Sequence, residues 1–276
     1  GMDKGDTFLE RISPQSFQVI LNQQPFKQSQ GPDWPTPKGN FPDYDLFICY
    51  GGSASFSFHD ETYEVVPGCG ILVKPYERIS VSRTSSENFR AIAQHFDLHL
   101  FDTIDYLSFI KLRRFVRFSR WDFVSEAMDR YAEYCMSKKF RLLRYHLFFS
   151  VLAEFIYDAY IEEETEVNHQ SMTFIDIAHA IESGVSDPDI LEKALKKSPY
   201  SREYSIRLFK RYFKLTPKQF LTRIRVRSAK DLLSQGYSVK ETAQLVGLQD
   251  EFYFSRLFSK QMEMSPVEYK MNQGIR

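Results

Sequence analysis

The hydrophobic and polar positions of this chain follow two different periods, and the change of period divides the chain in two. Between residues 40 and 100, short apolar runs carry a small or polar residue at every second position, as in residues 53–58, which is the period of a half-buried strand. Pro67 and Gly68 mark one of the turns between such runs. Several short strands with close turns predict a small β-barrel or sandwich.

From about Trp121 the apolar positions recur at helical spacing instead. We expect one helix from there to about Cys135 and a second helix over residues 142–160. The second helix has apolar residues around more of its circumference than a single buried stripe requires. It is therefore either central to a core or packed against another subunit, and the sequence leaves both explanations open.

An acidic stretch without any period, residues 162–171, predicts a linker between two domains. The length of 276 residues is too great for one small domain and comfortable for two. We therefore predict an α+β protein, with a β-barrel and appended helices in residues 1–161 and an all-α domain in residues 172–276.

The formal net charge of zero hides an asymmetry between the two parts. Residues 1–171 hold 18 Lys and Arg against 24 Asp and Glu, whereas residues 172–276 hold 18 against 12. Within residues 193–230 there are 13 basic side chains and one acidic side chain, Glu203. A stretch of one sign attracts polyanions, although an ordinary solvated basic helix face would show the same composition.

The last third of the chain contains an internal repeat with an offset of 49 residues. The Arg-Leu-Phe of residues 207–209 falls on the Arg-Leu-Phe of residues 256–258, and Thr216-Pro217 falls on Ser265-Pro266. Self-similarity of this kind indicates a repeated supersecondary unit.

Helix start and stop signals define the unit. Thr216, Ser238 and Ser265 each begin a capping box, in which a Gln or Glu follows three residues later. Gly247 is placed to end the helix that Ser238 begins, and Asp250 to cap the next one. A short helix, a tight turn and a second helix form a helix-turn-helix.

At this point the sequence resembles a known family. Residues 243–258 (AQLVGLQDEFYFSRLF) and residues 265–269 (SPVEY) closely resemble the signature of AraC-type transcription regulators, in which A-x-x-x-G-[FL], Y-F-S-R-x-F and S-P-x-x-[YF] follow one another. The resemblance covers about 100 residues. It implies two helix-turn-helix units joined by a long helix, here residues 217–235. Their recognition helices would enter successive major-groove segments of double-stranded DNA.

The first unit departs from this pattern at three places. Ser205 stands where an apolar residue is expected, Lys214 replaces the usual Gly, and Ser198-Pro199 lies where the turn glycine of the second unit would fall. These changes put the packing and aim of the first recognition helix in doubt.

The resemblance also implies which side chains contact DNA. Exposed positions of the first turns, and the Arg of the R-x-F element, would contact base edges, where Arg binds guanine, Glu accepts from cytosine and an apolar group meets the thymine methyl. Arg207 has a phosphate contact as its alternative. For the remaining cations the alternative is an ordinary surface position. The predicted base contacts are Arg202, Glu203, Ile206, Arg207, Gln249, Glu251, Phe252 and Arg256, and the predicted phosphate contacts are Lys210, Arg211, Lys218, Arg223, Arg225 and Arg227.

Many members of this family carry an N-terminal cupin barrel that binds an effector, followed by dimerising helices. The Pro67-Gly68 turn and Pro75 resemble the cupin P-G-x-x-x-x-x-x-P element. The resemblance thus implies a sensor and dimerisation domain at residues 1–161, a small-molecule effector, a homodimer and a DNA-binding domain at residues 172–276. A protein partner in place of the effector is the alternative.

A metal-dependent cupin enzyme is a third hypothesis. Such enzymes use an H-x-H pair, whereas His95 and His99 are four residues apart and His59 stands alone. No G-x-S-x-G, P-loop or G-x-G-x-x-G motif stands in a fitting context. We therefore expect no enzyme activity, no cofactor and no metal.

The cysteines and the hydropathy bear on where the protein works. The three cysteines include no C-x-x-C pair, and no apolar run reaches the ~18 residues of a membrane span. No segment resembles a signal peptide. We expect a protein of the reducing cytoplasm.

Overall fold

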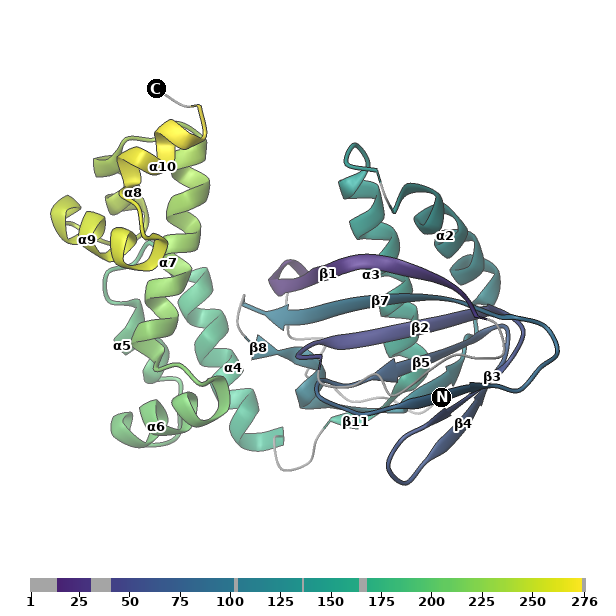
Figure 1. The fold of residues 1–276 in the computed structure, drawn as a ribbon. Helices are drawn as coiled ribbons and strands as arrows, with labels where there is room; N and C mark the ends of the chain where they lie inside the picture. Colours follow the sequence, from purple (N-terminus) through teal and green to yellow (C-terminus); the bar gives the residue numbers. More distant parts are fainter. Residues whose placement is uncertain (1–13, 31–40, 102–103, 136, 164–167, 275–276) are drawn as a thin grey trace. The chain divides into compact units, whose positions relative to one another are not determined.

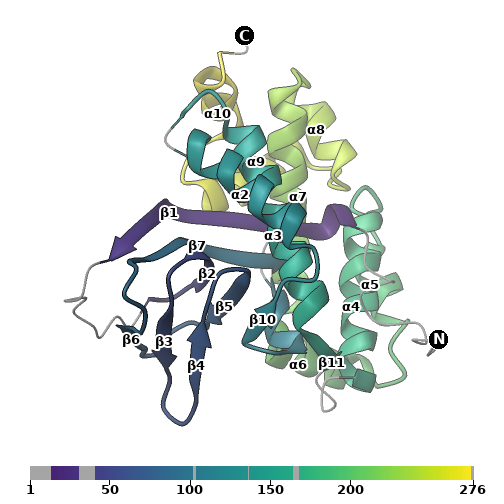
Figure 2. The same ribbon diagram turned by 90° about the vertical axis from the view of Figure 1, so that its right-hand side faces the viewer.

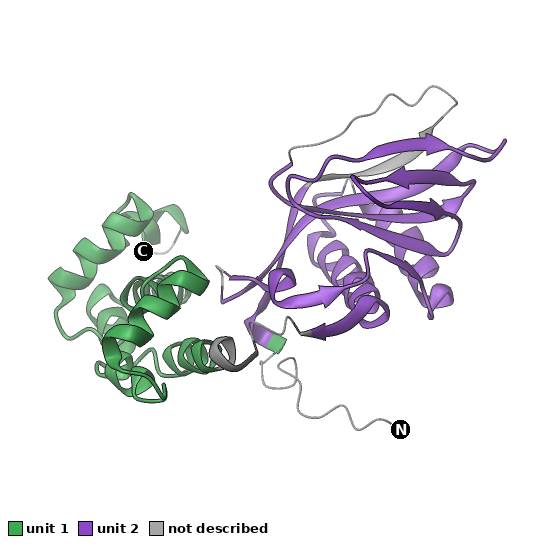
Figure 3. Cartoon of the chain, turned by 90° about the horizontal axis from the view of Figure 1, so that it is seen from below, with its two compact units in different colours: residues 1–14, 165–276 green, residues 15–164 purple. Residues whose placement is uncertain are grey.

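The computed structural model describes residues 14–30, 41–101, 104–135, 137–163 and 168–274. The chain divides into two compact units, one holding residues 15–164 and the other residues 1–14 and 165–276 (Figure 3). We call them the β-rich unit and the helical unit. This division is that of an α+β protein with two domains, so the predicted fold class is confirmed.

The β-rich unit is built from three antiparallel sheets (Figures 1 and 2). Six strands form the main sheet in the order β1-β7-β2-β5-β10, with β8 pairing β7; three form the sheet β4-β3-β6; and β11 pairs β9. Their bounds, with two short 3₁₀ helices, are η1 (Pro14–Ser16), β1 (Phe17–Gln30), β2 (Tyr44–Gly51), β3 (Ala54–Ser57), β4 (Thr62–Val65), β5 (Cys69–Val73), β6 (Ser80–Arg83), β7 (Phe89–Leu100), β8 (Ile104–Asp105), η2 (Tyr106–Phe109), β9 (Ile110–Leu112), β10 (Phe115–Arg117) and β11 (Tyr160–Glu163).

The main sheet is covered on both faces. On one face, Phe47 of β2 meets Phe56 of β3 with ring centroids 5.1 Å apart, in a core shared by the two larger sheets. Burial in this core raises the pKa of the Cys49 thiol to about 11, so the thiol stays protonated at neutral pH and packs as a small hydrophobe. On the other face, Phe96 packs on Phe148 of a long helix. The sheet therefore lies between a smaller sheet and a pair of helices.

Two helices make this second layer, α2 (Trp121–Tyr134) and α3 (Arg141–Ala159). Tyr131 of α2 donates a hydrogen bond to the buried Gln94 side chain of β7. The bounds agree with the two helices expected from the apolar spacing. The predicted second helix extends to Tyr160, whereas in the structure Tyr160 begins β11, because its backbone pairs with Leu112 of β9.

The helical unit is arranged around one central helix, α7 (Pro217–Ser234), which contacts each of the other six helices of the unit (Figure 1). Phe220 of α7 packs on Phe209 of α6, and Val226, Ala229 and Leu233 pack in the core of the second half of the unit. The other helices are α4 (Asn168–Ser183), α5 (Ile190–Leu195), α6 (Arg202–Phe213), α8 (Val239–Leu245), α9 (Glu251–Met262) and α10 (Pro266–Asn272).

The 49-residue repeat appears directly in the helix bounds. Helix α9 occupies the positions of α6 shifted by 49, and α10 begins 49 residues after α7. The three capping boxes are present, since Thr216, Ser238 and Ser265 each accept from the backbone N–H three residues later. Asp250 caps α9 by accepting from the N–H groups of Phe252 and Tyr253. The chain therefore holds two helix-turn-helix units, α5–α6 and α8–α9.

The departures of the first unit are accommodated by local hydrogen bonds. Ser205 is fully buried, and its hydroxyl donates to Ser201 O at 2.8 Å and pairs with Ser198 Oγ at 2.7 Å. A buried hydroxyl with such partners avoids the cost of an unsatisfied polar group. Lys214 adopts a left-handed conformation with φ 61°, as its repeat partner Glu263 does with φ 56°. The helix α6 therefore ends as α9 does, without glycine.

The predicted linker, residues 162–171, spans the boundary between the two units. The structure assigns Glu162 and Glu163 to β11 and begins α4 at Asn168, while residues 164–167 lie outside the described residues. Among the described residues, no helix is long and apolar enough to cross a membrane.

The turn of the second helix-turn-helix packs through Gly247 against the segment that follows α4 and against α7. This residue has φ +80°, and a Cβ added there would lie 2.7 Å from Val185 O and 3.0 Å from Arg225 Nη2. Gly236 has φ +96°, and a Cβ there would meet nothing within 4 Å. A side chain at either position would therefore strain the backbone, but only at Gly247 would it also clash with neighbouring atoms.

We expect Gly247→Ala to destabilise the helical unit by about 1–3 kcal/mol more than Gly236→Ala, because both changes incur the left-handed strain and only the first adds a clash. Urea unfolding followed by far-UV circular dichroism would measure the difference. Both tryptophans, Trp34 and Trp121, precede residue 165, so their fluorescence should report an unchanged β-rich unit. Equal losses of stability in the two variants would show that the packing of this turn is loose.

Candidate nucleic-acid interface

The second helix of each helix-turn-helix unit turns one face into the core and leaves the other in solvent. In α9, Phe254 and Phe258 are fully buried, with ring centroids 5.8 Å apart. In α6, Leu208, Phe209 and Phe213 are buried in the same way. The opposite faces hold the positions that the sequence predicts to contact bases.

On α9 the exposed face is a ridge formed by Phe252 and Arg256, one helical turn apart. Phe252 is 71% exposed, so its ring is accessible to a partner. Gln249 is exposed just before the helix, and Glu251 is half-buried. The Asp250 cap fixes the backbone from which these side chains project.

On α6 the corresponding positions are also accessible. Arg202, Glu203 and Arg207 are exposed, and Ile206 is half-buried. The Arg207 guanidinium lies over the Tyr204 ring, 5.1 Å from its centroid, which restrains the side chain through a cation–π contact. Both units therefore present an arginine on the outer face of the second helix.

Arg202 is engaged in an ion pair within the chain. Its Nε lies 3.0 Å from Glu192 Oε2 and its Nη2 lies 2.7 Å from Glu192 Oε1. This hydrogen bonding lowers the pKa of the Glu192 carboxyl and raises the pKa of Arg202. Both groups are about half exposed, so the pair contributes little stability and DNA can compete for the arginine.

The predicted phosphate contacts fall into two groups. Lys210, Arg211, Lys218 and Arg223 are exposed. Arg225 is 9% exposed and its Nη2 donates to Asp187 O at 3.3 Å, because this side of α7 packs against the segment between α4 and α5. Its assignment as a phosphate contact is therefore wrong.

Arg227 is the other predicted phosphate contact with a partner inside the chain. It is half-buried, and its Nη2 lies 3.5 Å from Glu182 Oε1 of α4. Such a contact joins α7 to α4 and holds the guanidinium within the helical unit.

The β-rich unit holds a buried polar cluster on the side of the main sheet that faces β3, β4 and β6. His95 is directed by Nδ1 at Asp43 Oδ1, 2.8 Å away, and by Nε2 at Asp45 Oδ2, 3.3 Å away. Asn22 Nδ2 donates to Asp43 and to Asp97 at 3.0 and 2.9 Å. These contacts satisfy polar groups that would be costly to bury alone.

This cluster does not have the form of a metal site, because the two ring nitrogens of His95 are directed at carboxylates on opposite sides of the ring. Across the described residues, no group of three or more His, Cys, Asp or Glu side chains is placed to hold a metal ion.

Comparison with known proteins matches both units. A family model described as a helix-turn-helix domain matches residues 195–272, and one described as an AraC-like ligand binding domain matches residues 26–119. The chain is therefore similar to AraC-type transcription regulators in each of its two units. The helix-turn-helix match runs from the end of α5 to the end of α10, and the other match covers most of the β-rich unit.

Individual relatives match this chain over part of its length. The raffinose operon transcriptional regulatory protein RafR of Pediococcus pentosaceus is 38% identical over 76 residues, which cover 27% of each chain. The HTH-type transcriptional regulator MtrA of Neisseria gonorrhoeae is 30% identical over 133 residues, 45% of this chain and 44% of the relative. The matches thus span less than half of the length of these relatives.

Among solved structures, the C-terminal domain of AraT, a response regulator from Geobacillus stearothermophilus, is 29% identical. The alignment covers 38% of this chain and 88% of that chain, with a TM-score of 0.36.

Proposed function

We propose that this protein is a transcription regulator that binds specific sequences of double-stranded DNA through α6 and α9. The observation that carries the proposal is the repeat itself: two helix-turn-helix units, offset by 49 residues, each bury an aromatic face and expose an arginine-bearing face. A helix fits the major groove, and two helices joined through α7 would occupy successive segments of it. The charge of the helical part supports the proposal, because cations outnumber acids there by 18 to 12 over residues 172–276.

The proposed contacts divide by chemistry. Phe252 would meet a thymine methyl, while Gln249, Glu251, Arg202, Glu203, Ile206, Arg207 and Arg256 would contact base edges. Lys210 and Arg211, at the exposed end of α6, would contact phosphates and position the protein without specifying sequence.

We expect Phe252→Ala to weaken binding to a duplex selected from a random pool by about 1–3 kcal/mol, the usual loss for one mispaired contact, and to leave binding to unrelated DNA unchanged. Phe252 is highly exposed, so the fold should be unaffected. Fluorescence anisotropy titration would measure both affinities.

A DNA variant supplies the matched control for this prediction. Replacing the contacted thymine by uracil removes only the methyl group, so it should weaken the wild-type protein and leave Phe252→Ala unaffected. Equal losses in the two proteins would remove Phe252 from the set of base contacts.

The β-rich unit is the proposed sensor, and a small-molecule effector bound there would change how the helical unit is presented to DNA. The match of residues 26–119 to a ligand binding domain supports this assignment. An effector acts only to the extent that it binds the two states with different affinity. A protein partner acting through the helices α2 and α3 is the competing proposal.

We expect one compound of a metabolite panel to raise the melting temperature of the full chain, since a ligand at 100 times its Kd adds about 2.7 kcal/mol to the stability of the unit that binds it. The shift should appear in the fluorescence of Trp121, which lies in the β-rich unit. A shift confined to the helical unit would contradict the sensor assignment. A panel without any shift would favour the protein partner.

A homodimer is proposed through α3, whose apolar side chains serve two surfaces. Phe148, Val151 and Phe155 are buried in the core. On the opposite side Leu142 is 73% and Tyr157 is 75% exposed. His146, Ser150 and Ala153 are exposed between them, so this side of α3 presents a stripe about 22 Å long that is apolar at both ends.

The occupant proposed for this stripe is α3 of a second copy, in antiparallel orientation. A two-fold axis near Ser150 would place Leu142 of each copy against Tyr157 of the other. It would also bring His146 of one helix close to Glu154 of the other, so the basic and acidic positions complement each other.

We expect Tyr157→Arg to convert a dimer into a monomer, because it places a charge in the centre of each apolar contact. Sedimentation equilibrium at micromolar concentration would measure the change. Tyr76→Arg is a matched control, since Tyr76 is 66% exposed and lies elsewhere in the β-rich unit. A wild-type monomer, or a Tyr157→Arg dimer, would rule out this interface.

A further inference from the structure

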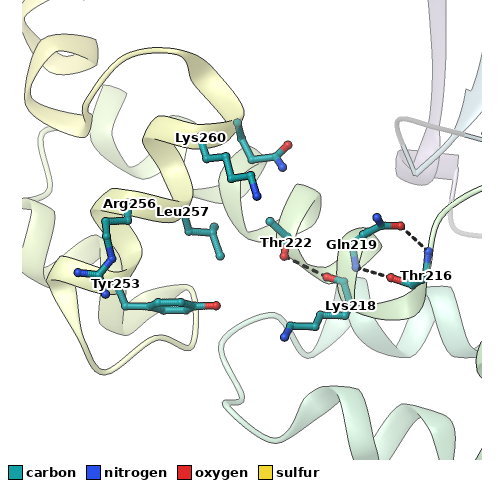
Figure 4. A pocket seen from close by; sticks show the side chains of 9 residues that line it. Thr216, Lys218, Gln219, Thr222, Tyr253, Arg256, Leu257 and Lys260 are labelled. Carbon is teal, nitrogen blue, oxygen red and sulfur yellow. Dashed lines mark hydrogen bonds between the residues drawn. The ribbon is translucent and has the colours of Figure 1, made fainter.

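A pocket of about 480 Å³ opens between α9 and the first two turns of α7, within the helical unit (Figure 4). Lys260, Tyr253 and Leu257 reach into it from α9, with Arg256 at its edge. Lys218 and Thr222 line the side that α7 contributes. We call this the basic pocket; its lining is completed by Thr216, Gln219 and Gln261.

The charge of the basic pocket is of one sign. Lys218, Arg256 and Lys260 line it, and no acidic side chain does. None of the three forms an ion pair with any acid in the described part of the chain, whereas Lys193, Arg202 and Arg227 of the same unit each have one. Three neighbouring cations without a counter-charge repel one another, and an anion placed between them relieves this repulsion.

The helix α7 adds to the attraction for an anion. It has 18 residues and begins at Pro217, on the wall of the pocket, so the positive end of its dipole lies there. In the capping box the Thr216 hydroxyl oxygen and the Gln219 side-chain carbonyl oxygen act as acceptors. The Tyr253 hydroxyl and the ammonium groups of Lys218 and Lys260 are hydrogen-bond donors on the lining of the pocket (Figure 4).

The position of the pocket on α7 identifies the source of the anion. Phe209 of α6 packs on Phe220 at the start of α7, with ring centroids 5.7 Å apart, while α9 packs on α7 further along, around Val226 and Ala229. The basic pocket therefore lies between the two recognition helices. DNA that passes from one major-groove segment to the next presents its phosphate backbone in this interval.

We propose that the basic pocket binds a backbone phosphodiester of the DNA between the two segments that α6 and α9 contact. This inference rests on the function proposed above. Lys218 and Lys260 hold the phosphate by charge, and Tyr253 donates a hydrogen bond to it. The contact positions α9 along the duplex without specifying a base.

The first test uses the salt dependence of binding to the duplex selected by the full chain. Neutralising one phosphate contributes about 0.9 to the slope of log K against log salt, so Lys218→Gln with Lys260→Gln should flatten the slope by about that amount. Between 50 and 200 mM salt this corresponds to about 3.5-fold less loss of affinity than in the wild type. Lys74→Gln with Lys138→Gln, which changes two exposed lysines of the β-rich unit, is the matched control and should not alter the slope.

The second test neutralises the DNA. A single methylphosphonate is placed at each backbone position in turn, which removes one charge and keeps the base sequence. The wild type should lose affinity several-fold at one or two adjacent positions between the contacted segments, and the Lys218→Gln, Lys260→Gln protein should lose nothing further there. Equal losses in the two proteins, or no sensitive position in that interval, would overturn the proposal.

Two further outcomes separate the possible failures. If no duplex is selected by the wild type, the proposed DNA-binding function fails and the pocket proposal falls with it. If inorganic phosphate raises the melting temperature of the wild type but not of the double variant, and no methylphosphonate position is sensitive, the basic pocket binds a free anion and the DNA assignment is overturned.

Discussion

Burial of two aromatic faces against one helix is the constraint on which the helical unit depends. Phe209 and Phe213 on one side, and Phe254 and Phe258 on the other, are all nearly or fully buried, and each set meets α7. Fully burying side chains of this size contributes about 1.5–3 kcal/mol each, far more than any surface ion pair in the unit. Because both second helices must turn their aromatic faces inward, their arginine-bearing faces must turn outward. The functional surface is therefore a consequence of the core.

The sequence predicted best what is decided locally. A capping box needs only four consecutive residues, so Thr216, Ser238 and Ser265 could be identified without knowledge of the fold, and the 49-residue offset reappears unchanged in the helix bounds. Contacts between distant segments were not accessible in this way. The burial of Arg225 depends on a carbonyl 38 positions away, and the pairing of Arg202 with Glu192 depends on how α5 meets α6. The basic pocket could not be predicted from the sequence for the same reason, since Lys218 and Lys260 come together only when α9 packs beside α7.

The two units of the chain differ in where their buried polar side chains find hydrogen-bond partners. In the helical unit, Ser205 occupies an apolar position and finds its partners within seven residues of itself. In the β-rich unit, His95 of β7, Asn22 of β1 and Asp43, directly before β2, are brought together only when these strands are paired in register. A network of this kind favours one register over its neighbours, because a slip of one strand by one residue would turn that strand's member of the network to the opposite face.

The close approach of Gly247 to Val185 has a consequence for the proposed operator. The turn of the second helix-turn-helix packs on the segment that connects α4 to the first one, so the two halves of the helical unit share a contact in addition to α7. Each extra base pair between their target segments would rotate one segment by about a tenth of a helical turn relative to the other. Because α7 and the Gly247 contact both hold the two halves of the helical unit together, these halves have little freedom to follow such a rotation. The separation of the two target segments should therefore be as strictly constrained as their base sequence.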